Sequence, residues 1–85
     1  MKITTTQRFD TEYTSLPSTL KKMIDRKLRL FQENSRHPSL HTKKMKGHNN
    51  IWEGRITKKY RFTFHIQEDC CFLRRIGTHD ILKTP

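Results

Sequence analysis

An arginine and a histidine in the C-terminal half of this chain carry the groups that phosphate chemistry needs. Arg61 lies in the alternating segment of residues 60–67, and His79 follows Ile76-Gly77-Thr78. Cleavage of RNA by its own 2′-hydroxyl requires a base, a cation that stabilises the charge developing on the phosphate, and an acid for the leaving oxygen. Histidine, with an ordinary pKa of about 6.5, suits proton transfer, and the arginine fork matches two phosphate oxygens. This chemistry needs no metal and no other cofactor.

The alternation of residues 60–67 predicts a strand with one apolar and one polar face. The two sets are Phe62, Phe64 and Ile66 on the first face, and Arg61, Thr63 and His65 on the second. We therefore expect Arg61 to be open, as a phosphate clamp or as an ordinary solvent-facing arginine. His79 is either the proton-transfer group or a surface histidine after the last strand.

Several other residues are candidates for supporting roles in the same site. His65 is either a second proton carrier or an exposed cross-strand histidine. Asp80 either orients an imidazole or caps the following turn, and Arg55 adds a further cation. Arg74 and Arg75 are expected on opposite faces of the last strand, and we favour Arg75 for the basic face. The apolar face of that strand is ambiguous, because Cys71 and Leu73 compete with Phe72 and Ile76.

Basic side chains surround these candidates and suggest a grip on a phosphate backbone. The expected contacts are Lys43, Lys44, Lys46, Lys58 and Lys59. Trp52 either stacks on a base or belongs to the core. The histidines of the segment 37–50 do not have the spacing of a zinc site, so no metal site is expected.

The periodicity of the chain predicts the elements that position these groups. Residues 2–9 are rich in β-branched side chains and predict a strand, and Asp10 is expected to cap a short helical turn. Leu20, Met23, Ile24, Leu28 and Phe31 form one stripe of a helix over residues 17–34, opened by Pro17.

The second half of the chain predicts a polar connector and then a meander. The connector covers residues 37–50, and the strands cover 51–57, 60–67 and 70–76, with turns at 58–59 and 68–69. We therefore predict one α+β domain over residues 1–85, a small antiparallel sheet made of the N-terminal strand and the meander, with helices packed on one face.

The charge of the chain indicates the class of its partners. The formal net charge is +10 at pH 7 and the pI is about 10.1, which favours nucleic acid or an acidic protein. The sequence shows no apolar run long enough for a membrane span and no signal-peptide pattern. Its two cysteines, Cys70 and Cys71, are adjacent and do not predict a disulfide, so we expect a cytoplasmic protein.

In its order of motifs the sequence resembles the RelE/ParE toxin superfamily of bacterial toxin–antitoxin systems. The motifs are Phe9…Tyr13…Leu16-Pro17, His37-Pro38-Ser39-Leu40, Lys44-Met45-Lys46-Gly47, Trp52-Glu53-Gly54-Arg55, Tyr60-Arg61-Phe62-Thr63-Phe64 and Ile76-Gly77-Thr78-His79-Asp80. The resemblance implies a RelE/ParE-like fold and an acidic cognate antitoxin. It also implies one of two activities: RelE-like and YafQ-like members cleave mRNA in the ribosomal A site, and ParE-like members inhibit DNA gyrase.

The resemblance also assigns roles to individual residues. Tyr60-Arg61 is similar to the RelE arrangement, in which the arginine contacts the scissile phosphate. Gly77-Thr78-His79 is similar to YafQ, in which the histidine transfers a proton. The chain departs from YafQ in having Arg55 and Lys59 where a His and an Asp are expected, and from RelE in lacking a tyrosine after Arg75. The sequence thus favours an mRNA endonuclease, with a gyrase inhibitor or a basic nucleic-acid-binding module as alternatives.

Overall fold

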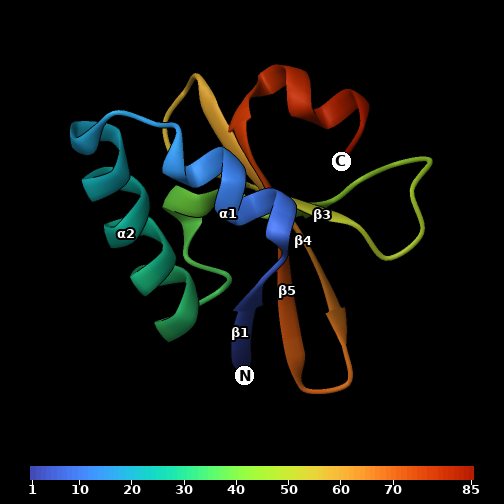
Figure 1. The fold of residues 1–85 in the computed structure, drawn as a ribbon. Coiled ribbons are helices and arrows are strands. Elements are labelled where there is room, and N and C mark those ends of the chain that lie inside the picture. The colour runs from blue at the N-terminus through green and yellow to red at the C-terminus, as the bar shows by residue number, and fades with distance from the viewer.

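The computed structural model describes residues 1–85 as a five-stranded sheet with two α-helices and two 3-10 helices (Figure 1). In chain order these are β1 (Lys2–Thr5), α1 (Gln7–Thr14), α2 (Ser18–Glu33), η1 (Pro38–Leu40), β2 (Lys43–Lys44), β3 (Trp52–Arg55), β4 (Tyr60–Gln67), β5 (Cys70–Thr78) and η2 (His79–Lys83). The strand order is β1-β5-β4-β3-β2. The predicted α+β class is confirmed. No helix has the length and apolar character that a membrane crossing requires.

The first strand is shorter than predicted, and its pairing differs. The chain turns into α1 at Gln7 because the Thr6 hydroxyl accepts from the Phe9 amide at 3.2 Å and also donates to the Leu73 carbonyl at 3.1 Å. Threonine is a favoured N-cap residue, so Thr6 and not Asp10 starts the helix. β1 lies parallel to β5, and the expectation of an entirely antiparallel sheet is wrong at this edge.

α2 packs one stripe of apolar side chains on the sheet. Ile24 and Phe31 are fully buried, and Leu20 and Leu28 pack against them. Met23, assigned to the same stripe, is 37% exposed, so the buried stripe is narrower than predicted. Pro17 is the residue before the first helical residue, where an extended backbone and a missing amide are both tolerated.

The predicted connector of residues 37–50 contains two short elements. Pro38 begins η1, whose Leu40 is fully buried and anchors the segment to the core. β2 then pairs with β3 through Lys43 opposite Glu53 and Lys44 opposite Trp52. This connector therefore becomes the edge of the sheet.

The pairing of β3 and β4 separates the two faces of the sheet. Phe62 lies opposite Gly54, and Phe64 lies opposite Trp52. The Phe31 ring meets Phe62 and Phe64 edge-on, with centroid distances of 5.3 and 4.8 Å. These contacts form the core face. Ile66, predicted for the same face, is 37% exposed, because β3 begins at Trp52 and does not continue beside it.

A bulge in β5 resolves the ambiguous phase of that strand. Leu73 pairs with Phe64, but Arg75 pairs with Thr63, so Arg74 is an extra residue. Before the bulge the core side chains are Cys71 and Leu73, and after it the core side chain is Ile76. The prediction that Arg74 and Arg75 point to opposite faces is therefore wrong.

The face opposite the core is partly covered by the C-terminal residues, which curl back over the sheet (red in Figure 1). Thr63 is fully buried there, and its hydroxyl donates to the Pro85 carbonyl at 3.3 Å. Arg74 donates from Nε to the same carbonyl at 3.2 Å. Ile81 is buried beside Gly77. The C-terminal residues therefore interrupt the expected open basic face, which continues at the β3 side of the sheet.

Arg75 joins this C-terminal segment to α1. Its Nη2 lies 2.6 Å from Glu12 Oε2 in an ion pair, and its Nη1 donates to the Thr84 hydroxyl at 2.9 Å. Both partners of the ion pair are largely shielded, which strengthens a charge-assisted bond. Arg75 therefore lies on the face opposite the core, as predicted, but its side chain holds α1 and the C-terminal segment together.

His65 supports the same segment from β4. Its ring stacks on Phe72 with centroids 4.9 Å apart, and its Nδ1 accepts from Arg74 Nη1 at 2.9 Å. Burial lowers the pKa of His65, and the charge of Arg74 lowers it further. The neutral imidazole is thus the form that the fold favours.

We predict that Gly54→Ala destabilises the protein strongly. A Cβ at position 54 would lie 2.3 Å from Phe62 Cζ, and the Phe62 ring is fully buried. Overpacking of this kind costs about 1–3 kcal/mol, to be measured by urea unfolding. Gly77→Ala is the comparison and should lose less, because its Cβ would meet one Ile81 methyl at 2.8 Å and not two ring carbons at 2.3 and 2.4 Å. Equal losses in the two variants would contradict the prediction.

We also predict that acid weakens the fold through His65. Since the pKa of His65 is lower in the folded protein than in the unfolded chain, the unfolded state binds more protons below about pH 6.5. The contribution of His65 is therefore complete above that pH and is lost as the pH falls through the folded pKa. His65→Gln keeps an acceptor for Arg74 but does not titrate. Thermal melts from pH 7.5 to 5 should fall more steeply for the wild type; parallel curves would refute this role.

Candidate functional site

A cationic cavity lies on the face opposite the core, at the β2 edge. Its volume is about 330 Å³, and no hydrophobic residue lines it. The lining residues come from the end of η1, β2, β3 and β4, and they are His41, Thr42, Lys43, Glu53, Arg55 and Arg61. Three cationic side chains meet a single carboxylate, so the cavity suits an anion.

Arg61 occupies the inner wall of this cavity. The residue is only 8% exposed, so the expectation of an open side chain is wrong. Its Nη1 donates to the carbonyls of Thr57 and Lys58 at 2.7 and 2.6 Å, which draws the guanidinium down onto the bend between β3 and β4. Burial lowers the pKa of Arg61, the charge of Arg55 lowers it further, and Glu53 offsets part of the effect.

Arg55 lies directly opposite Arg61 in the β3–β4 ladder. Like charges at a cross-strand pair are unfavourable. The Nε atom of Arg55 is buried and has no hydrogen-bond acceptor in the protein. Buried donors are nearly always paired, so this donor needs an acceptor that the chain itself does not supply. An anion beside Arg55 and Arg61 would meet that need and reduce their repulsion.

The sequence did not identify His41, Thr42 or Glu53 as residues of this site. His41 follows η1 in a left-handed conformation with φ of 47°, and its side chain is exposed at the mouth of the cavity. The available signal was the position of His41 in the chain. It lies between Leu40, which is apolar and buried in the core, and Lys43, which begins the edge strand β2. Glu53 could have been found from its register opposite Lys43.

The structure does not bring His79 into this cavity. Thr78 pairs with Tyr60 and Gly77 with Arg61, so His79 follows the last paired residue of β5. Its side chain is exposed at the start of η2 and makes no hydrogen bond within the protein. Asp80 Oδ1 lies 4.0 Å from Lys83 Nζ, and both are exposed, so this pair contributes little stability.

The basic residues predicted to grip a backbone divide into two groups. Lys43 lines the cavity, whereas Lys44, Lys46, Lys58 and Lys59 do not line it and are exposed on β2 and on the two loops that flank β3. His65 and Arg75 are held by the structural contacts described above. No group of three His, Cys, Asp or Glu side chains is placed to hold a metal ion.

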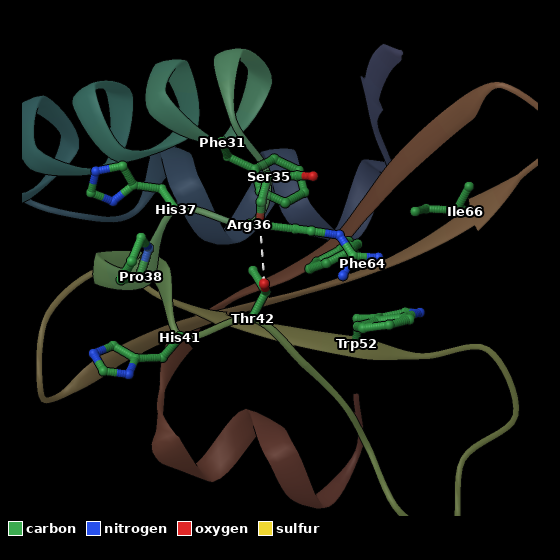
Figure 2. Close-up of a pocket in the computed structure, with 10 residues that line it drawn as sticks. All are labelled: Phe31, Ser35, Arg36, His37, Pro38, His41, Thr42, Trp52, Phe64 and Ile66. Carbon is green, nitrogen blue, oxygen red and sulfur yellow. Dashed lines mark hydrogen bonds between the residues drawn. The ribbon is translucent and has the colours of Figure 1, made fainter.

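A second cavity lies on the core face of the sheet, beside the residues that follow η1 (Figure 2). Its volume is about 370 Å³, and its aromatic residues are Phe31, Trp52 and Phe64. His41 and Thr42 line both cavities. The residues after η1 therefore contribute to a purely polar cavity on one face of the sheet and to an aromatic cavity on the other face.

Comparison with known proteins gives a match at the level of the fold. No protein-family model matches this sequence, and no curated protein matches it. Among solved structures, a YoeB/ParE toxin from Agrobacterium tumefaciens has a TM-score of 0.77 at 18% identity, covering 93% of this chain and 99% of that chain. YafQ from E. coli has a TM-score of 0.77 at 10% identity, covering 95% and 96%.

An archaeal complex gives a third comparison. In the RelB–RelE antitoxin–toxin complex from Methanococcus jannaschii, the matched chain has a TM-score of 0.70 at 22% identity, covering 95% of this chain and 98% of that chain. The similarity extends over nearly the whole of each chain. The RelE/ParE-like fold predicted from the motifs is therefore confirmed, and this chain has the fold shared by the RelE, ParE, YoeB and YafQ toxins.

Proposed function

We propose that this protein is the toxin of a type II toxin–antitoxin pair and that it cleaves mRNA on the ribosome. The observation that carries the proposal is the buried, unpaired Nε of Arg55 beside Arg61 in a cavity without apolar residues. A phosphodiester offers the acceptors that this pair requires, with one negative charge per nucleotide. RNA is favoured over other anions because the fold is that of the RelE and YafQ toxins.

In the proposed reaction, the scissile phosphate lies between Arg55 and Arg61. The two guanidinium groups stabilise the charge that grows on the phosphate oxygens as the 2′-oxygen attacks and the P–O5′ bond breaks. Arg61 is already fixed by the Thr57 and Lys58 carbonyls, so little side-chain entropy is lost in the reaction. The proton from the 2′-hydroxyl goes to a base, and the leaving 5′-oxygen receives one from an acid.

Two imidazoles are available for these proton transfers. His41 lines the cavity itself, and His79 begins η2 just after the pairing of Gly77 with Arg61. Histidine suits both roles near neutral pH. We propose His79 as the second proton-transfer group on the strength of the YafQ-like motif, and His41 on the strength of its position.

One observation favours a second candidate function. His79 is outside the cavity, so the catalytic set around Arg61 is incomplete in the structure. A toxin that inhibits DNA gyrase by protein contact, as ParE-like members do, needs no such set. In that case a supercoiling assay should respond to the protein while RNA remains intact.

An acidic antitoxin is the proposed protein partner. The chain carries a net charge of +10, and the matched archaeal RelE was solved with its RelB antitoxin. Bringing an acidic chain to this surface releases the mutual repulsion of its cations.

We predict that Arg61→Lys lowers the rate of translation inhibition by about 10²–10³-fold, as for loss of one transition-state donor. Lysine keeps the charge but lacks the rigid planar fork that lets Arg61 bind the Thr57 and Lys58 carbonyls and still present N–H groups to a phosphate. Arg55→Gln should give a similar loss. The assay is in vitro translation with toe-printing on a defined mRNA. Arg29→Gln, on the exposed side of α2, is the control and should keep full activity. Unchanged cleavage by both cavity variants would refute the mechanism.

We also predict that co-expression with an acidic product of the adjacent gene silences the protein and raises its thermal midpoint. A partner that binds only the folded state stabilises it by mass action, by about 2.7 kcal/mol at a free concentration of 100 Kd. The measurement is co-purification followed by thermal unfolding. A complex that forms without any rise in the midpoint would speak against a specific antitoxin.

A further inference from the structure

A third cavity lies where the start of α1, the bulge of β5 and the C-terminal residue meet. Its volume is about 200 Å³, and it is lined by Thr6, Arg8, Arg74, Arg75 and Pro85. No acidic residue lines it, and every lining side chain except the proline ring is polar. We call it the three-arginine cavity. Its lining favours an anion, because guanidinium groups donate charge-assisted hydrogen bonds to anionic oxygens.

The three arginines differ in how far the protein already satisfies them. Arg75 is held by its ion pair with Glu12, so its charge is largely compensated. Arg74 uses Nε and Nη1 in the contacts described above, and its Nη2 has no acceptor within the protein. Arg8 is exposed, and its side chain makes no hydrogen bond or ion pair within the protein. Arg8 and Arg74 therefore keep donors for a ligand.

The three-arginine cavity lies on the same face of the sheet as the Arg55–Arg61 cavity. Arg61 and Thr63 alternate with the core residues of β4, so both side chains are on the face opposite the core. The Thr63 hydroxyl and Arg74 Nε donate to the same carbonyl, that of Pro85. Because Pro85 and Arg74 line the three-arginine cavity, the two cationic cavities share one face, with the C-terminal residue between them.

The register of the sheet places the two cavities within reach of one nucleic-acid strand. Thr63 is two residues from Arg61 along β4, and Arg75 lies opposite Thr63 on β5. With a rise of about 3.4 Å per residue and about 4.8 Å between strands, the backbone positions of Arg61 and Arg75 are about 8 Å apart. A nucleic-acid strand covers that distance in about two or three nucleotides at the duplex spacing of about 3.4 Å per nucleotide.

We propose that the three-arginine cavity binds a backbone phosphate of the RNA strand whose scissile phosphate lies between Arg55 and Arg61. The inference rests on the proposed function for the identity of the strand. Arg8 and Arg74 supply the free donors, and the second contact fixes the direction in which the strand crosses the sheet. A phosphate contact carries no sequence information, so this cavity positions the strand and does not select a codon.

An acidic side chain of a protein partner is the competing occupant of the three-arginine cavity. The centres of protein–protein interfaces are depleted of charged residues and enriched in apolar and aromatic ones, and this cavity has no aliphatic or aromatic side chain apart from the Pro85 ring. Phosphate and sugar, in contrast, receive at least half of the hydrogen bonds in protein–DNA interfaces, many of them from arginine. Two cationic cavities on one face also match the repeated charge of a phosphodiester backbone.

The experiment compares a long strand with one that has a single phosphate. The intact protein is titrated by NMR with a 2′-O-methyl RNA of about nine nucleotides, which is within the range of single-strand sites and cannot be cleaved, and with a 2′-O-methyl dinucleoside monophosphate. Arg8→Gln should weaken binding of the long strand by about 2- to 5-fold at low salt. It should also make the slope of log K against log salt shallower by about 0.7, as for one lost phosphate contact.

The short ligand and a matched variant supply the controls. Binding of the dinucleoside monophosphate should not respond to Arg8→Gln, because its single phosphate occupies the Arg55–Arg61 cavity. Arg26→Gln, on the exposed face of α2, removes the same charge and should leave the salt slope unchanged. Equal effects of Arg8→Gln and Arg26→Gln on the long strand would overturn the site.

Two further outcomes separate this site from its alternatives. If Arg8→Gln weakens binding of the acidic partner protein but not of the long RNA, the cavity belongs to that partner and the proposal is wrong. If the wild type binds the long strand with the expected dependence on Arg8 but cleaves no mRNA in the translation assay, only the proposed function is refuted.

Discussion

The packing of the Phe62 ring over Gly54 fixes the geometry on which the cationic cavity depends. A side chain at position 54 would collide with that ring, so β3 can approach β4 in this register only with glycine there. The next pair in the same ladder is Arg55 opposite Arg61. An apolar contact on one face of the sheet therefore forces two like charges together on the other face.

The chain accommodates this repulsion in two ways, and the difference between them defines the site. The Arg61 side chain is buried, and its guanidinium donates to the Thr57 and Lys58 carbonyls. These hydrogen bonds within the protein partly replace the hydration that the guanidinium loses. Arg55 keeps a buried Nε without any acceptor. Unmet hydrogen bonding in a folded protein tends to mark function, because selection for stability alone removes it. The Arg61 side chain is therefore already fixed by the protein, whereas Arg55 has a buried donor that a bound anion would satisfy.

The sequence predicted the α+β class and most of the element types because these depend on local patterns. The buried stripe around Ile24 and Phe31 and the alternation of Phe62 and Phe64 are examples. It could not predict features that depend on distant contacts. The bulge at Arg74 depends on the register of β5 with β4. The burial of Thr63 depends on the C-terminal segment, whose Pro85 is 22 residues later in the chain. His41 lines the cavity because β2 pairs with β3. The sequence did not predict β2, because this strand has only two residues and both are lysines.

The segment from Ser35 to Lys43 contributes residues to both cavities and is anchored to the core. Leu40 anchors it from below, the hydrogen bond of Thr42 to Ser35 closes it against α2, and β2 holds its end to β3. Because His41 and Thr42 line both cavities, a shift of this segment changes the shape of both cavities together. The site is therefore preorganised by one short, well-anchored loop, and a partner chain that moved this loop would disable both cavities without touching either arginine.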